Sequence, residues 1–233
     1  ALHLTFTMAD NPGLSPEVLA RYKAMFRGTF YRRFVLGEWA AAEGLVYDFF
    51  GPELVQPVPE SLDGPWYISC DYGTVNPTSM GLWGQKGGVW YRTAEFYYDS
   101  RKTGRQQTDG EYADDLARLA GGRDIRGVVL DPSAASFREE LIRRGWTVYR
   151  AENEVLSGIR RTAELLRAGQ LVVCAPCGDA IREFGLYRWD TAATGDRVVK
   201  EHDHAMDDIR YFAVTVAGRR SEGFFAGAVE RSG

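Results

Sequence analysis

The sequence predicts an α/β domain with a mixed β-sheet, helices on both faces of that sheet and a β-hairpin before the last helix. Apolar, β-prone runs follow one another between residues 66 and 98, and apolar runs alternate with helical periods from residue 109 onward. A hydrophobic content of 45% and an aromatic content of 13% in 233 residues supply a packed core. A strand meander followed by alternating strands and helices is typical of such a sheet.

The segment before residue 60 differs from the rest of the chain. Ser15-Pro16-Glu17 has the capping residue, proline and acid of a helix start, and helical spacing continues to Phe26. Residues 30–39 are aromatic and basic, and four prolines between residues 52 and 65 mark a linker. We therefore expect residues 1–60 to form a linker region and residues 61–233 to form the domain.

The domain is expected to open with strands at 66–71, 79–83 and 89–98, with a turn at 85–88. The later strands, short and apolar, are expected at 127–131, 147–151 and 171–174. The helices follow from apolar spacing and glycine stops, and are expected at 109–119, 135–144, 155–168, 180–187 and 203–217. The predicted hairpin spans 188–200, around Thr194-Gly195-Asp196.

Composition excludes several classes of protein. No apolar run reaches the roughly 20 residues of a membrane helix, and a net charge of −4 argues against coating nucleic acid through general electrostatics. A nuclease with a local basic groove stays possible.

The three cysteines, Cys70, Cys174 and Cys177, are too few for a disulfide framework or a four-ligand zinc site, so we expect reduced thiols in a cytoplasmic compartment.

Two predicted strands end in an aspartate, Asp71 and Asp131. Ligands bind beyond the carboxyl ends of strands in an open α/β sheet, so the two carboxylates converge if these strands are neighbours. Alternatively, Asp131-Pro132-Ser133 is only a strand-to-helix turn whose aspartate caps the next helix.

The last helix begins with a dense acidic cluster, EHDHAMDD at residues 201–208. At about 100° per residue, His204, Asp207, Asp208 and Tyr211 fall on one face, with Asp203 at its border and an apolar stripe opposite. Several carboxylates in one cleft repel one another, and hard cations such as Mg²⁺ or Mn²⁺ remove that repulsion. Two such ions about 4 Å apart hold the attacking water and the leaving oxygen of a phosphodiester. The alternative is a solvated helix end, where acids favour the positive pole of the helix dipole.

Three stretches resemble the nuclease domain of the large terminase subunits of tailed bacteriophages. They are ISCDYG at 68–73, LDPSAASF at 130–137 and DHAMDDIRY at 203–211. AENEVLSGI at 151–159 and YRRFVLGEW at 31–39 also fit, so the likeness covers nearly the whole chain in the expected order.

The resemblance implies an RNase H-like fold and a metal-dependent endonuclease that cuts concatemeric double-stranded viral DNA. It gives metal-ligand roles to Asp71, Asp131 and Asp207, for two Mg²⁺ or Mn²⁺ ions. His204 would lie near the metals and shuttle a proton or orient an acid. The family often has alanine where this chain has Asp208, so the resemblance leaves open whether Asp207, Asp208 or both bind metal.

Proteins of that family also carry an ATPase motor before the nuclease. No G-x-x-x-x-G-K-[ST] loop occurs in this chain, so we expect no ATPase activity from it. Residues 1–60 resemble the end of the motor and its linker. The implied partners are DNA, a motor domain, a small terminase subunit and a portal, with packaging taking place in the host cytoplasm and no membrane involved.

Basic residues near the acidic cluster are candidates for contacts with the DNA backbone: Lys200, Arg197, Arg160 and Arg161. Arg101, Lys102 and Arg105 form a second basic group in a polar loop, and each candidate is otherwise an ordinary solvated charge. Backbone contacts carry no base information, so cleavage with little sequence preference is expected. Two other functions stay open, a non-catalytic module that docks on a portal or motor, and another RNase H-like nuclease such as a junction resolvase.

Overall fold

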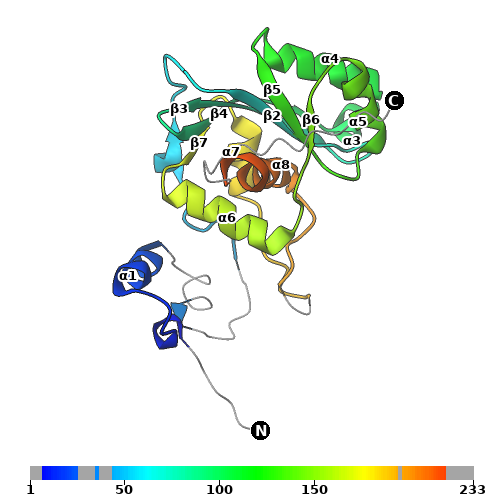
Figure 1. Ribbon diagram of the computed structural model, residues 1–233. Coiled ribbons are helices and arrows are strands. Elements are labelled where there is room, and N and C mark those ends of the chain that lie inside the picture. The colour runs from blue at the N-terminus through cyan, green and yellow to red at the C-terminus, as the bar shows by residue number, and fades with distance from the viewer. Residues whose placement is uncertain (1–6, 26–34, 37–43, 194–195, 219–233) are drawn as a thin grey trace, which may run out of the picture.

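The computed structural model describes residues 7–25, 35–36, 44–193 and 196–218, and a seven-stranded sheet lies at its centre (Figure 1). The strand order is β1-β7-β4-β3-β2-β5-β6. The strands are β1 (Val55–Gln56), β2 (Trp66–Asp71), β3 (Thr78–Lys86), β4 (Val89–Tyr98), β5 (Ile125–Leu130), β6 (Val148–Arg150) and β7 (Leu171–Cys174).

The sheet is mixed, as the sequence predicts. β2, β3 and β4 form an antiparallel meander, β5 lies parallel to β2, and β6 lies parallel to β5. At the other edge β7 is parallel to β4 and β1 is parallel to β7. The β3–β4 turn consists of Gly87 and Gly88, whose φ angles of 57° and 82° suit a two-residue hairpin turn that requires positive φ at both positions.

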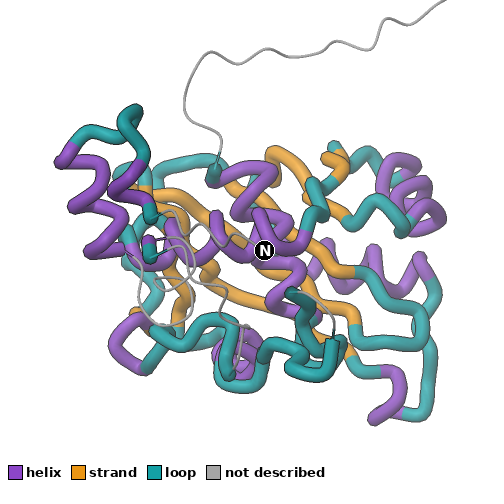
Figure 2. The backbone as a smooth tube through the Cα atoms, turned by 90° about the horizontal axis from the view of Figure 1, so that it is seen from below, coloured by secondary structure: helices purple, strands orange, loops and turns teal. Residues whose placement is uncertain are grey.

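Helices cover both faces of the sheet, which confirms the predicted layers (Figures 1 and 2). α4 (Asp109–Ala120) and α5 (Ala135–Arg143) lie on one face, whereas α6 (Val155–Arg167), α7 (Gly178–Phe184) and α8 (His204–Phe212) lie on the other. The shorter elements are η1 (Met8–Asp10), η3 (Pro52–Leu54), α3 (Ser100–Thr103) and the π-helical turn η4 (Ala213–Ala217), and α1 (Pro16–Met25) precedes the sheet.

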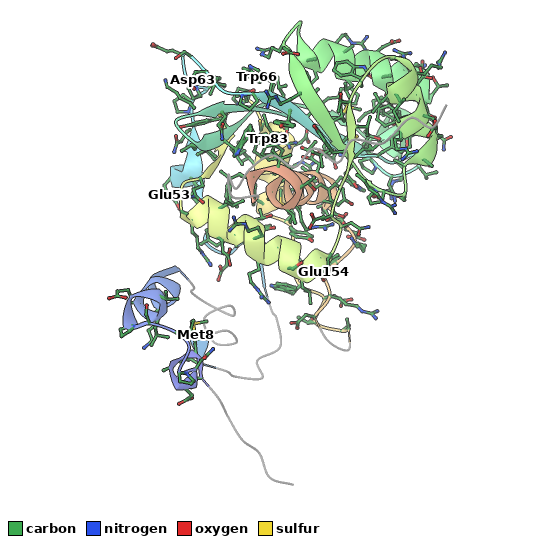
Figure 3. All side chains as sticks on the ribbon, viewed as in Figure 1. Met8, Glu53, Asp63, Trp66, Trp83 and Glu154 are labelled. Atoms are coloured by element: carbon green, nitrogen blue, oxygen red, sulfur yellow. The ribbon has the colours of Figure 1, made fainter. Side chains whose placement is uncertain are left out.

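The alternation of side chains along β2 divides the core into two. Ile68 and Cys70 pack with Tyr112 and Phe137 under α4 and α5. Tyr67 points to the other face, where Phe212 of α8 stacks on Trp83 of β3 with ring centroids 4.1 Å apart (Trp83 is labelled in Figure 3). α8 is therefore fixed to the middle of the sheet by aromatic packing.

Most expected elements are confirmed, with shifts at their ends. The helix expected at 203–217 is α-helical only to Phe212, and the helix expected at 180–187 spans 178–184. The predicted hairpin has one antiparallel bridge, Trp189 with Val198, and its tip at 194–195 lies outside the described residues. β1 and α3 were not predicted, because two and four residues are too short to show a period.

Residues 44–56 of the expected linker pack against the sheet domain. Val46 and Tyr47 are buried in the part of the core that lies between the sheet and α8, and β1 extends the edge of the sheet. The division of the chain near residue 60 stays a prediction. Most of the basic aromatic stretch at 30–39, His3 and the tail from residue 219 lie outside the described residues.

Two further features of the fold concern the cysteines and the length of the helices. All three cysteines are buried and unpaired, as expected of structural thiols. Within the described ranges, no helix combines the length and apolarity that crossing a membrane requires.

Replacing Phe212 with alanine tests the docking of α8. Phe212 is fully buried, and truncation of such a side chain lowers the free energy of unfolding by about 3–5 kcal/mol. The control Ile142→Ala removes a side chain from a residue that is 49% exposed on α5, and should change that free energy by less than about 0.5 kcal/mol. Denaturation in guanidinium chloride measures both, and similar losses in the two variants would contradict this packing.

Candidate active site

The carboxyl ends of β2 and β5 bring Asp71 and Asp131 together. Cys70 and Leu130 are partners in the parallel β2–β5 ladder, and the next residue on each strand is an aspartate. The backbone N–H of Asp131 donates to the carbonyl of Cys70 at 3.4 Å. The predicted convergence of these two strand-end carboxylates is thus present in the fold.

Tyr211 of α8 contacts both of these aspartates. Its hydroxyl lies 3.2 Å from Oδ2 of Asp131 and 3.5 Å from Oδ1 of Asp71. Burial and the charges of Asp71, Asp207 and Asp131 raise the pKa of Tyr211, so the phenol stays protonated and remains a donor. Because it has one proton, it can donate to one of the two carboxylates at a time.

His204, the first residue of α8, reaches the same place. Its Nδ1 lies 2.9 Å from Oδ2 of Asp71, and its Nε2 lies 3.9 Å from Oδ1 of Asp203. Burial lowers the pKa of His204, but the hydrogen bond and charge of Asp71, with smaller contributions from Asp203 and Glu183, outweigh burial and raise it overall. A neutral imidazole that donates from Nδ1 to Asp71 keeps Nε2 as an acceptor.

Asp207 lies one turn further along α8 and pairs with two cations. Its Oδ1 accepts from Nη2 of Arg210 at 2.9 Å, and its Oδ2 lies 3.4 Å from Nζ of Lys200. The Lys200 ammonium also lies 3.2 Å from Oδ2 of Asp203.

Burial raises the pKa of Asp71, and the charges of Asp207 and Asp131 raise it further, while the hydrogen bond from His204 lowers it. Burial is therefore the main cause of the raised pKa of Asp71, and the charges of Asp207 and Asp131 add to it.

Asp208 does not join this group. It is fully buried, and its carboxylate is held by Arg92 of β4 and by the hydroxyls of Ser69 and Ser79. The helical-face interpretation that placed it beside Asp207 is wrong in this respect, because Asp208 points into the sheet.

The acidic residues line one cleft of about 760 Å³. Asp71, Asp131, Asp203, His204 and Asp207 all belong to its lining, and so does Tyr211. Other polar groups complete its wall: Asn76, Asp99, Arg101, Lys102, Asn153, Arg182, Lys200, Glu201, His202 and Arg210. The chain segments that meet here lie up to 140 positions apart in the sequence.

The basic candidates divide between the cleft and other surfaces. Lys200 lines the cleft, but Arg197, Arg160 and Arg161 are not in its lining. Arg161 instead pairs with Glu164 at 3.1 Å and donates to the carbonyl of Gly218. Of the second basic group, Arg101 and Lys102 line the cleft, whereas Arg105 pairs with Glu111.

Some residues of the cleft were not singled out from the sequence. Arg182 and Asn153 line it, and Arg210 forms an ion pair with Asp207 three positions before it on α8. The spacing of Asp207 and Arg210 is a recognisable i,i+3 pair. The positions of Arg182 and Asn153 depend on tertiary packing and leave no local signal.

The donor set of the cleft fits a hard divalent cation. Asp71, Asp131 and Asp207 offer carboxylate oxygens to the cleft, and Mg²⁺ and Mn²⁺ prefer such ligands. As arranged, the described residues contain no ready-made group of three or more His, Cys, Asp or Glu side chains for a metal ion. Asp207 is turned to Lys200 and Arg210 instead.

Known proteins that resemble the chain come from solved structures. No protein-family model and no curated protein matches the chain. Among solved structures, the large terminase of a thermophilic bacteriophage, solved in complex with ADP, is 44% identical, with a TM-score of 0.86. The match covers 92% of this chain and 55% of that one, so the chain spans little more than half the length of this relative.

Two structures of nuclease domains match at lower identity and show the fold alone. The nuclease domain of the P22 large terminase is 19% identical, with 72% of this chain and 90% of that one covered and a TM-score of 0.59. The large terminase nuclease of the thermophilic phage G20c, solved with bound magnesium, is 16% identical, with coverages of 73% and 97% and a TM-score of 0.55. The chain is thus similar to a phage large terminase over nearly its whole length, and its domain has the RNase H-like fold of terminase nuclease domains.

Proposed function

We propose that this chain is the nuclease part of a phage DNA-packaging terminase and cleaves double-stranded DNA with divalent cations. The observation that carries the proposal is the meeting of Asp71, Asp131 and Asp207 in one cleft. The similarity to the ADP-bound large terminase supports it, because that match covers 92% of this chain at 44% identity. In this proposal residues 1–60 belong to the end of a motor region, and the motor, small subunit and portal are partners in the host cytoplasm.

The residues of the cleft have distinct roles in this proposal. Asp71, Asp131 and Asp207 would hold Mg²⁺ or Mn²⁺, which supply charge neutralisation and Lewis-acid activation of water. His204 is positioned by Asp71 and can accept a proton at Nε2. Tyr211 positions the two strand-end carboxylates by donating its hydroxyl proton to Asp131 or to Asp71. Asp208 has no ligand role, because its oxygens already accept from Arg92 and two serines.

DNA would lie against the basic wall of the cleft. Arg101 and Lys102 of α3 face the same cleft as the acids, Arg182 lies on α7, and Lys200 lies beside Asp207. The Arg101 guanidinium is oriented by Asn76 at 3.0 Å, whereas the Lys102 side chain is 74% exposed. These charges would contact phosphates, so binding would be salt-dependent and weakly selective for sequence.

Removal of a strand-end carboxylate tests the catalytic assignment. Asp71→Ala or Asp131→Ala is expected to lower plasmid cleavage in Mn²⁺ by at least about 100-fold, because an outright ligand loss exceeds the 10- to 100-fold cost typical of outer-shell changes. Asp63→Ala is the control, because Asp63 is exposed and precedes β2 at the end of the strand opposite Asp71 (Figure 3). Undiminished cutting by purified Asp71→Ala or Asp131→Ala protein rejects the assignment.

Metal addition is expected to stabilise the fold, since cations relieve the repulsion between the carboxylates. A free Mn²⁺ concentration of 100 times the dissociation constant adds about 2.7 kcal/mol to the free energy of unfolding. Thermal melts with Mn²⁺, and again after chelation with EDTA, measure this gain. Asp71→Asn should gain much less, and an equal gain in that variant would show that the ions bind elsewhere.

The basic wall is tested by removing two adjacent charges. Arg101→Gln combined with Lys102→Gln is expected to weaken DNA binding. It should also flatten the slope of the logarithm of the DNA-binding constant against the logarithm of the salt concentration by up to about 2, since each phosphate contact contributes about 0.9 to that slope. Arg160→Gln with Arg161→Gln is the matched double control from α6. Fluorescence anisotropy with a short duplex, metal-free and at several salt concentrations, gives both slopes. A larger change in the α6 variant would place the DNA on that surface instead.

A further inference from the structure

Buried polar side chains lie between α8 and the sheet. Arg92 and Asp208 are both fully buried, and so are Ser69 and Ser79. A buried ion pair contributes little to stability and is often replaceable by apolar residues of similar volume. Its presence here therefore calls for a reason other than stability.

The contacts of Asp208 saturate its carboxylate from three strands. Arg92 of β4 donates from both terminal nitrogens, Nη2 to Oδ2 at 3.0 Å and Nη1 to Oδ1. Ser69 of β2 donates to Oδ1 at 2.8 Å, and Ser79 of β3 donates to Oδ2. Charge-assisted hydrogen bonds of this kind are strong and directional. The contact between Arg92 and Asp208 is bidentate.

The sheet is shaped to accept this group. A methyl group at Gly81 of β3 would lie 1.9 Å from Nη1 of Arg92, so only glycine leaves room for the guanidinium. Arg92 also pairs with Glu95 at 3.3 Å, and Glu95 accepts from the backbone N–H groups of Asp179 and Ala180 at the start of α7. The network thus connects α8, the sheet and α7.

Both serines that hold Asp208 are neighbours of Asp71. Ser69 is two residues before Asp71 on β2 and points to the same face, and Ser79 is the cross-strand partner of Asp71. The hydrogen bonds of Asp208 therefore end on the strand segments that carry the first acid of the cleft. On α8, Asp207 directly precedes Asp208, and His204 lies one turn earlier.

We propose that Arg92 and Asp208 are positioning residues that set the rotation of α8, so that Asp207 and His204 face Asp71 across the cleft. Aromatic packing of Phe212 on Trp83 keeps α8 on the sheet but is not directional about the helix axis in the way a bidentate ion pair is. A shift of about 1 Å in a site of this kind costs as much as 100-fold in rate. This inference rests on the proposed function, because the consequence it names is the affinity of the cleft for a divalent cation.

The test compares stability with metal affinity in the full chain. Asp208→Asn removes the charge at constant shape, and the double variant Arg92→Met, Asp208→Leu replaces the pair with apolar groups. Both are expected to raise the Mn²⁺ dissociation constant at least about tenfold, the lower end for outer-shell changes. Electron paramagnetic resonance of free Mn²⁺ measures the affinity, and guanidinium denaturation measures the stability of each variant.

Asp115 provides the matched control. It is a buried carboxylate on α4, on the opposite face of the sheet, where it pairs with Arg118 and accepts from Gln107 at 3.1 Å. Asp115→Asn should lower stability and leave the Mn²⁺ dissociation constant within about twofold, because outer-shell effects require contact with the site.

The double variant separates positioning from stability even where Asp208→Asn does not fold. Stability near that of the unaltered chain together with weakened Mn²⁺ binding supports the inference. Equal Mn²⁺ affinity in the double variant and the unaltered chain overturns this inference alone. Failure of the unaltered chain to bind Mn²⁺ overturns the proposed function and this inference with it.

Discussion

The parallel pairing of β2 with β5 is the contact from which the geometry of the cleft follows. It places the ends of two strands at one edge of the sheet, and the residue after each paired Cys70 and Leu130 is an aspartate. Burial raises the pKa of Asp71, and the repulsion from Asp207 and Asp131 raises it further. The neutral hydroxyl of Tyr211 and the imidazole of His204 reduce the repulsion without neutralising it.

Two adjacent acids on α8 each pair with a buried guanidinium, but only Asp207 also faces the cleft. Asp208 is neutralised by Arg92, whose side chain has no exposed surface. Asp207 meets the Lys200 ammonium, whose side chain is 63% exposed, and the buried Arg210. A buried guanidinium keeps its charge and place. The Asp207 oxygen that faces Lys200 is the one open to exchange, because an exposed ion pair contributes little. The negative charge available to a ligand is therefore confined to the cleft side of the helix.

Local patterns in the sequence predicted the parts of the site that depend on local structure. Asp71 and Asp131 follow apolar strands, and His204 and Asp207 share a helical face. Asp208 was misplaced because, at about 100° per residue, it falls near 40° from both His204 and the buried Phe212, so it lies at the border between the acidic and the apolar face. Its true direction depends on Arg92, whose position across the sheet is fixed by strand register. Arg101 and Lys102 likewise reach the cleft through tertiary packing around a four-residue helix.

The RNase H-like topology itself brings the ends of two parallel neighbours and the start of the last helix to one place. Chains with 16–19% identity to this one share that topology, so the convergence of these three positions is a property of the fold. Function depends on which residues occupy them. In this chain the three positions hold Asp71, Asp131 and Asp207, with His204 and Tyr211 within hydrogen-bond distance of the first two. An apolar residue at any of them would remove a carboxylate from the cleft, and at position 207 it would also leave the buried Arg210 without its ion-pair partner.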